Sequence, residues 1–222
     1  SRPAAGQPGG ATAAGTAESA SFKLNGATVS GANVAGLTLT ATAAGTLETL
    51  NIESAGSVKN TVALTSANVI AKAVVTGGAD LEVRSTAGTL NGVELVGSGH
   101  TGVLTVNADF DGGAAVVGLN AEKYTGVDAY VITDTKATGG ATGVGLFNIT
   151  SGSSVRLADD IDAASIITVA GSAASTADSV NLLLQNRATT ATDIDVVGGL
   201  TINNVESIKI TSSGAPTTGD TQ

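Results

Sequence analysis

The chain has 222 residues, no Cys, Met or Trp, and a formal net charge of −9 at pH 7. Without cysteine there is no disulfide framework, thiol nucleophile or thiolate metal site. The negative charge argues against a nucleic-acid partner, whose phosphates require clustered Lys and Arg. No apolar run approaches the roughly 18 residues that a membrane span needs, so no span is expected.

The chain begins with a stretch, residues 1–20, that is rich in Ala, Gly, Pro and Thr and has no apolar period. This composition predicts a flexible linker or chain edge. A first β unit is predicted over residues 21–107, where short β-branched runs alternate with Gly, Ser, Asn or Thr clusters. Leu50 and Ile52 flank Asn51 in one such run, which indicates a strand with one buried face.

Turns that recur this often fit either a solenoid of stacked coils or a meandering sandwich. We therefore predict an all-β chain with very little helix, built as an elongated parallel β-solenoid-like stack of short strands. A β-sandwich is the alternative. Small and β-branched side chains, which dominate the composition, suit thin sheets that stack closely.

The second half of the chain differs in charge from the first. An acidic connecting segment is predicted over residues 108–145, a second β unit over residues 146–214, and a flexible tail over residues 215–222. Residues 109–222 contain 13 of the 19 acidic residues of the chain. Most of these acids are Asp, a common oxygen ligand in calcium loops, which favours binding of a divalent cation in this half.

Two groups of acids are candidate structural calcium ligands. Asp109 and Asp111 lie two residues apart and precede two glycines, whose backbone carbonyls could add further oxygens. Asp159, Asp160 and Asp162 place three carboxylates within four residues, and a cation would relieve their mutual repulsion. In both groups the alternative is a solvated acidic turn. His100 has no evident partners for a catalytic triad, and we expect the protein not to be an enzyme.

One internal repeat stands out. The segment 48–56, ETLNIESAG, corresponds to the segment 206–214, ESIKITSSG. Each copy opens with Glu, continues with apolar residues two apart and ends at Gly, which suggests two related β units. Glu48 and Glu206 are therefore predicted to accept hydrogen bonds from backbone N–H groups at equivalent strand starts.

Four strings carry a resemblance to a known family: TLETLNIESAG, IAKAVVTGGADLEV, TADSVNLLL and NNVESIKITSSG. They resemble bacterial surface-layer (S-layer) proteins of the RTX-associated, type I-secreted family. The family's tandem calcium nonapeptide, GGxGxDxxx, has no copy here. The resemblance implies a secreted structural subunit on the bacterial outer cell surface, which forms a lattice with copies of itself and is ordered by calcium. A cell-surface polysaccharide or lipopolysaccharide is a candidate anchoring partner.

Two other functions stay open. The first is an RTX-type adhesin or carbohydrate-binding repeat module, against which the aromatic content of 2 % counts. The second is a β-helix polysaccharide lyase, which would need a cleft with calcium-bound acids beside a basic residue. The isolated Arg84, Arg156 and Arg187 give that role little support.

Overall fold

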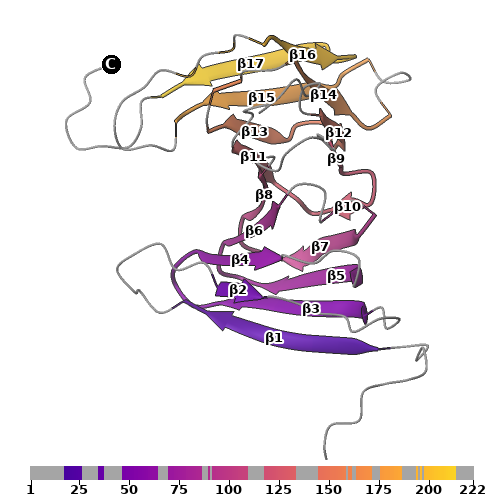
Figure 1. Ribbon diagram of the computed structural model, residues 1–222, viewed down its shortest axis with the longest axis vertical. Helices are drawn as coiled ribbons and strands as arrows, with labels where there is room; N and C mark the ends of the chain where they lie inside the picture. Colours follow the sequence, from indigo (N-terminus) through magenta and orange to yellow (C-terminus); the bar gives the residue numbers. More distant parts are fainter. Residues whose placement is uncertain are drawn as a thin grey trace, which may run out of the picture.

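The structure is a computed structural model, and its strands are stacked along one long axis from the N-terminal to the C-terminal end (Figure 1). It describes the following residues: 18–26, 35–37, 47–64, 70–86, 90, 92–109, 118–133, 145–158, 160–161, 164–171, 176–186, 194, 196 and 198–213. Within these ranges the regular structure consists of strands. No helix in the described ranges has the length and apolar character needed to cross a membrane.

The first strands, in chain order, are β1 (Ser19–Asn25), β2 (Ala35–Leu37), β3 (Leu47–Ala55), β4 (Asn60–Leu64), β5 (Ile70–Gly77), β6 (Leu81–Thr86), β7 (Glu94–His100) and β8 (Leu104–Asp109). They are followed by β9 (Leu119–Asn120), β10 (Tyr124–Thr125), β11 (Ala129–Thr133), β12 (Gly145–Ile149), β13 (Ser154–Leu157), β14 (Ser165–Val169), β15 (Ser179–Leu184), β16 (Leu200–Asn203) and β17 (Ser207–Ser212). β1 begins at Ser19, inside the stretch predicted as a linker.

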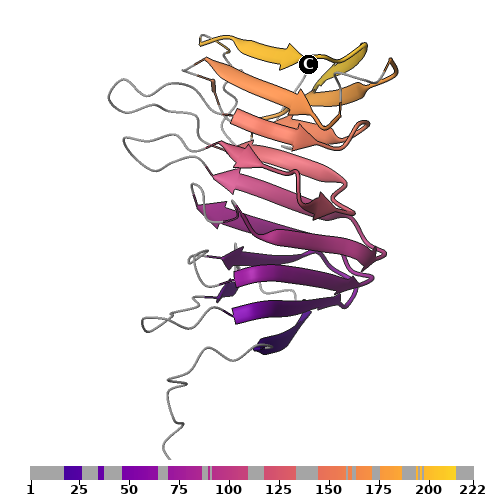
Figure 2. The same cartoon turned by 90° about the vertical axis from the view of Figure 1, so that its right-hand side faces the viewer.

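Successive strands lie on two opposite faces of the molecule (Figure 2). One face is a continuous eight-stranded sheet in the order β17-β15-β13-β11-β8-β6-β4-β2. The other face consists of a five-stranded sheet, β1-β3-β5-β7-β10, and a four-stranded sheet, β16-β14-β12-β9. Every described strand pairing is parallel, and each joins strands one coil apart, as in β3–β5 and β4–β6. The chain is therefore a parallel β-solenoid, which confirms the predicted fold class.

The coils differ in length, and this explains why the sequence shows no strict period. Lys72 on β5 pairs with Glu94 on β7, 22 residues later. Lys23 on β1 pairs with Glu53 on β3, 30 residues later. The pairing register is regular along most of the stack and shifts between Val74 and Thr76 of β5 and between Leu146 and Ile149 of β12.

The core is formed by the inward-facing side chain of every second residue. On the eight-stranded sheet one buried column runs through Val83, Val106, Tyr130 and Val155, which are register partners on successive strands. Leu50 and Ile52, which the alternating pattern assigns to the buried face, are each 1 % exposed. Because each coil covers the apolar surface of the one before it, stability comes from stacking rather than from one globular core.

The solenoid changes its pairing near residues 118–128. There β10 pairs back to β7, while β9 pairs forward to β12, so that the two sheets of this face separate between them. The backbone passes very close to the preceding coil, since a Cβ added at Gly126 would lie 2.5 Å from the carbonyl carbon of Gly97. This break lies within the segment 108–145, predicted to connect two β units. On the opposite face β8, β11 and β13 remain paired through it. The division of the chain into two units stays a prediction.

Candidate functional site

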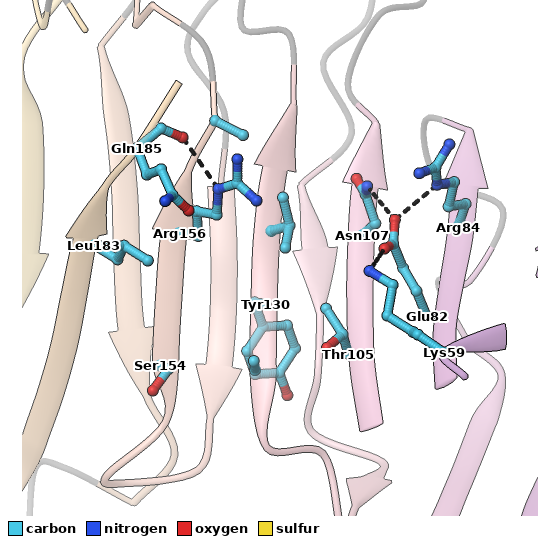
Figure 3. A pocket seen from close by; sticks show the side chains of 13 residues that line it. Lys59, Glu82, Arg84, Thr105, Asn107, Tyr130, Ser154, Arg156, Leu183 and Gln185 are labelled. Atoms are coloured by element: carbon cyan, nitrogen blue, oxygen red, sulfur yellow. Dashed lines mark hydrogen bonds and ion pairs between the residues drawn. The ribbon is translucent and has the colours of Figure 1, made fainter. Parts of the chain in front are cut away.

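A groove of about 590 Å³ lies on the outer face of the eight-stranded sheet. Its floor is formed by small outward-facing side chains on three successive strands, Thr105, Ala129 and Ser154, which are in register. Figure 3 shows charged side chains on both sides of this floor, with Glu82 and its partners at one side and Arg156 at the other. The remaining lining residues are Lys59, Arg84, Asn107, Tyr130, Val131, Ala158, Leu183 and Gln185.

One side of the groove is a hydrogen-bonded network around the Glu82 carboxylate. Lys59 Nζ lies 2.5 Å from Glu82 Oε2, and Arg84 Nε lies 2.7 Å from Oε1. Asn107 Nδ2 also donates to Oε1, at 2.9 Å. The Glu82 side chain is 6 % exposed, whereas those of Lys59 and Arg84 are 53 % and 43 % exposed. The three side chains therefore shield a buried carboxylate.

The hydrogen bonds of this network stabilise the ionised form of Glu82. Burial raises the pKa of this carboxyl, but the hydrogen bonds from Lys59, Asn107 and Arg84 outweigh burial and lower its pKa from 4.5 to about 2. Glu82 is therefore ionised at every physiological pH. Lys59 lies directly before β4, Arg84 lies on β6 and Asn107 lies on β8. The network therefore links three successive strands on the outer face of the sheet.

The other side of the groove is dominated by Arg156 on β13. Its Nε donates to the carbonyl of Gln185 at 3.0 Å, and its Nη2 donates to the carbonyl of Asn186 at 3.3 Å. Burial lowers the pKa of the Arg156 guanidinium, and the negative charge of Glu82 partly offsets this effect. Arginine side chains are effectively always protonated in proteins, so Arg156 remains cationic. No carboxylate within ion-pair distance of Arg156 is found in the part of the chain that the structure describes.

The two arginines of the groove lie in one row across the sheet. Arg84 is the register partner of Asn107, Asn107 of Val131, and Val131 of Arg156. Three strand spacings therefore separate them, which corresponds to roughly 14 Å. Arg84 and Arg156 are two of the three arginines considered for a lyase, and the third, Arg187, lies outside the described residues.

The predicted capping by the repeat glutamates is confirmed. Glu48 Oε2 accepts the backbone N–H of Glu18 at 2.6 Å, and Glu206 Oε2 accepts that of Asp178 at 2.7 Å. Each donor is the residue one coil earlier. The copies of the repeat lie on different faces, however, since β3 belongs to the five-stranded sheet and β17 to the eight-stranded sheet. Asp128 makes the same contact with the N–H of Leu104, at 2.8 Å, although it is outside the repeat.

Most of the predicted calcium ligands fall outside the described residues. This applies to Asp111, Asp159 and Asp162. Asp109 is the last residue of β8, and Asp160 is half-buried after β13. The ends of β8 and β13 lie on the same edge of the eight-stranded sheet with only β11 between them. Among the described residues no group of three or more His, Cys, Asp and Glu could hold a metal ion. The calcium sites thus stay predictions.

Two core positions on β17, the last described strand, are exposed. Ile210 on β17 is the register partner of Leu182 on β15, which is 5 % exposed, yet Ile210 itself is 63 % exposed. Ile208 pairs with the buried Val180 and is 43 % exposed. Within the described ranges β17 pairs only with β15, so its other edge presents unpaired backbone groups at the end of the stack (Figure 1).

Comparisons with models of protein families, with curated proteins and with solved structures give no match to this chain. The surface-layer resemblance therefore stays a prediction from four short motifs.

Proposed function

We propose that this chain is a structural subunit fragment of a bacterial surface layer, secreted to the outer cell surface and assembling there with further copies of itself and with calcium. The observation that supports this proposal best is the exposure of two core positions on β17, the last described strand. Ile208 and Ile210 continue two buried columns of the core, and no described coil covers them.

An exposed strand edge is an aggregation hazard for a monomer and an assembly surface for a lattice protein. Burying the exposed parts of Ile208 and Ile210 together against another copy would stabilise the contact between the two copies by roughly 2–3 kcal/mol. The parallel backbone hydrogen bonds of an added strand would give the contact its direction. The opposite end of the solenoid carries the strands β1 and β2, which pair within the described residues only with β3 and β4. A C-terminal end that meets an N-terminal end makes a heterologous contact, which can repeat without limit.

In this proposal, calcium binds acidic residues near the ends of β8 and β13. We assign the ligands to Asp109 and Asp111 in one group and to Asp159, Asp160 and Asp162 in the other. Of these residues, the structure describes Asp109, the last residue of β8, and Asp160, which follows β13 of the same sheet. Ions bound by these residues would neutralise carboxylates in a chain of net charge −9 and so stabilise the folded coils there.

Static light scattering and thermal unfolding, each measured with millimolar calcium and with a chelator, test this function. We expect calcium to raise both the scattering mass and the melting temperature. Equal scattering and equal melting temperatures under the two conditions would contradict it. An anomalous-scattering map of a calcium-soaked crystal would then separate the two groups of ligands, because ions at Asp109 and at Asp160 would give separate peaks.

The groove favours a second candidate function, that of an RTX-type adhesin or carbohydrate-binding repeat module. Its lining combines hydroxyl, amide and charged groups on a rigid sheet, and such groups can bind sugar hydroxyls and carboxylates. A glycan array without any bound sugar would remove this candidate and leave the assembly proposal unaffected.

A further inference from the structure

We propose that the groove on the eight-stranded sheet binds an extended acidic oligosaccharide, a sugar chain that carries carboxylates, with Arg156 as its principal anion contact. This inference rests on the second candidate function, for which it names the class of sugar, and it does not depend on the assembly proposal. The assembly contact lies on the edge of β17, whereas the groove lies on the outer face of the strands from β6 to β15.

The charge of the groove opposes that of the whole chain. Its lining residues include three cations, Lys59, Arg84 and Arg156, and one carboxylate, that of Glu82. The chain as a whole carries −9. Three cations around one acid on a negatively charged protein form a local site for an anion. The same overall charge disfavours nucleic acid, whose long phosphate backbone would meet the acidic remainder of the molecule.

The guanidinium of Arg156 is already oriented before a ligand binds. Its two hydrogen bonds to the carbonyls of Gln185 and Asn186 fix the plane of the guanidinium and satisfy two of its five N–H donors. An oriented guanidinium binds a carboxylate with little loss of side-chain entropy. Neither carbonyl carries a formal charge, so the positive charge of Arg156 is not cancelled by these contacts.

The second anchor is the exposed side of the Glu82 network. Lys59 and Arg84 each donate to Glu82 and remain about half exposed. Their other donors can reach solvent or a ligand. Since Arg84 and Arg156 are three strands apart in one row, roughly 14 Å, a ligand that contacts both must be longer than a single sugar ring.

The floor of the groove sets the polarity of the ligand. Thr105, Ala129 and Ser154 are small and leave room above the sheet, and Asn107 and Gln185 add amide groups. Hydroxyl and amide groups can exchange hydrogen bonds with sugar hydroxyls. The groove has no exposed aromatic anchor, since its one ring, that of Tyr130, is 1 % exposed, and this disfavours an apolar ligand or a peptide that docks through aromatic side chains.

Titration calorimetry with a galacturonate hexamer, compared with a neutral hexamer of glucose, tests the proposal. We expect the acidic hexamer to bind in the micromolar to millimolar range, to weaken with added salt, and to bind at least tenfold more tightly than the neutral one. Arg156→Gln should weaken binding of the acidic hexamer at least tenfold, because a charge-assisted hydrogen bond is lost. Lys72→Gln is the matched control, since Lys72 pairs with Glu94 on the opposite face, and should change the affinity less than twofold.

A second pair of variants tests the proposal independently, in case the Arg156 variant does not fold. Ser154 is exposed on the floor of the groove. Ser154→Glu places a carboxylate beside the ligand and should weaken binding at least tenfold, whereas Ser154→Gln, of similar size and neutral, should weaken it less than threefold. No binding of the acidic hexamer at millimolar concentration, equal binding of both hexamers, or equal effects of Glu and Gln at position 154 would each overturn the proposal.

Discussion

The Glu82 network offers the sharpest stability prediction, and the perturbation is Glu82→Gln. Glutamine keeps the shape of the side chain but removes the charge that faces Lys59 and Arg84. The difference between a pKa of 4.5 and a pKa of about 2 corresponds to roughly 3 kcal/mol of folding free energy at neutral pH. Domains unfold with about 5–15 kcal/mol, so the variant should lose a substantial part of its stability at pH 7.

The pH dependence gives the sign of the effect. The pKa of Glu82 is lower in the folded state, so its contribution is fully present above pH 4.5 and is lost as the pH falls from 4.5 towards 2. Urea unfolding of the natural chain and of the Glu82→Gln variant at pH 7, 4.5, 3 and 2 measures it. We expect a difference of roughly 3 kcal/mol at pH 7 that shrinks through this window.

A matched control separates a shielded carboxylate from an exposed one. Glu53 pairs with Lys23 at 2.6 Å, but their side chains are 47 % and 56 % exposed. Glu53→Gln should therefore cost less than about 1 kcal/mol. If the two variants lose the same stability, or if the Glu82 difference does not change between pH 7 and pH 2, the reasoning about this network is refuted.

Two further predictions concern single contacts, each measured by urea unfolding. Gly77 has a φ of +98°, and a Cβ added there would lie 2.0 Å from the carbonyl oxygen of Ser54. Gly92 also has a positive φ, +85°, but a Cβ added there would have no atom within 4 Å. Gly77→Ala should therefore cost about 3 kcal/mol or more and Gly92→Ala about 1–2 kcal/mol, and equal costs would contradict the close stacking at Gly77. The buried Tyr124 hydroxyl donates to the carbonyl of Leu90 at 2.9 Å, so Tyr124→Phe should cost about 1–2 kcal/mol, and a neutral substitution would contradict that contact.

The fold could be predicted from the sequence because strand patterns are local. Alternation places Leu50 and Ile52 on the buried face, and β-branched runs with frequent turns indicate stacked coils. The same local pattern predicts that Glu82, between Leu81 and Val83, points outward. Its near-complete burial depends on side chains from neighbouring coils, and no local pattern shows which residues those are.

The groove could not be predicted for the same reason. Arg84 and Arg156 can be singled out as isolated arginines, but their common row depends on the register of four strands. That register follows from coil lengths, which differ among the described strand pairs, with 21 residues between Asn60 and Leu81 and 35 between Ser165 and Leu200. A repeat with a fixed period would have revealed the columns, and this chain has none.

The internal repeat predicts one structural feature of its two copies correctly but not their positions in the fold. It correctly predicts that Glu48 and Glu206 accept backbone N–H groups, because that contact depends only on the residue one coil earlier. It does not show that the two copies occupy opposite faces, since each face of a solenoid accepts the same alternating strand. Asp109 ends β8 and Asp160 follows β13, so the alternating pattern within strands does not predict the geometry of a calcium site there.

Association with another copy through the exposed core positions Ile208 and Ile210 of β17 is tested most directly by sedimentation velocity in millimolar calcium. The natural chain is compared with Ile210→Lys, which places a charge on the uncovered core position. The control, Thr211→Lys, adds the same charge at the next residue of β17, which faces outward. We expect the natural chain and the Thr211 variant to form oligomers that grow with concentration, while the Ile210 variant stays monomeric. A monomeric natural chain, or equal association of the two variants, would contradict this mode of association.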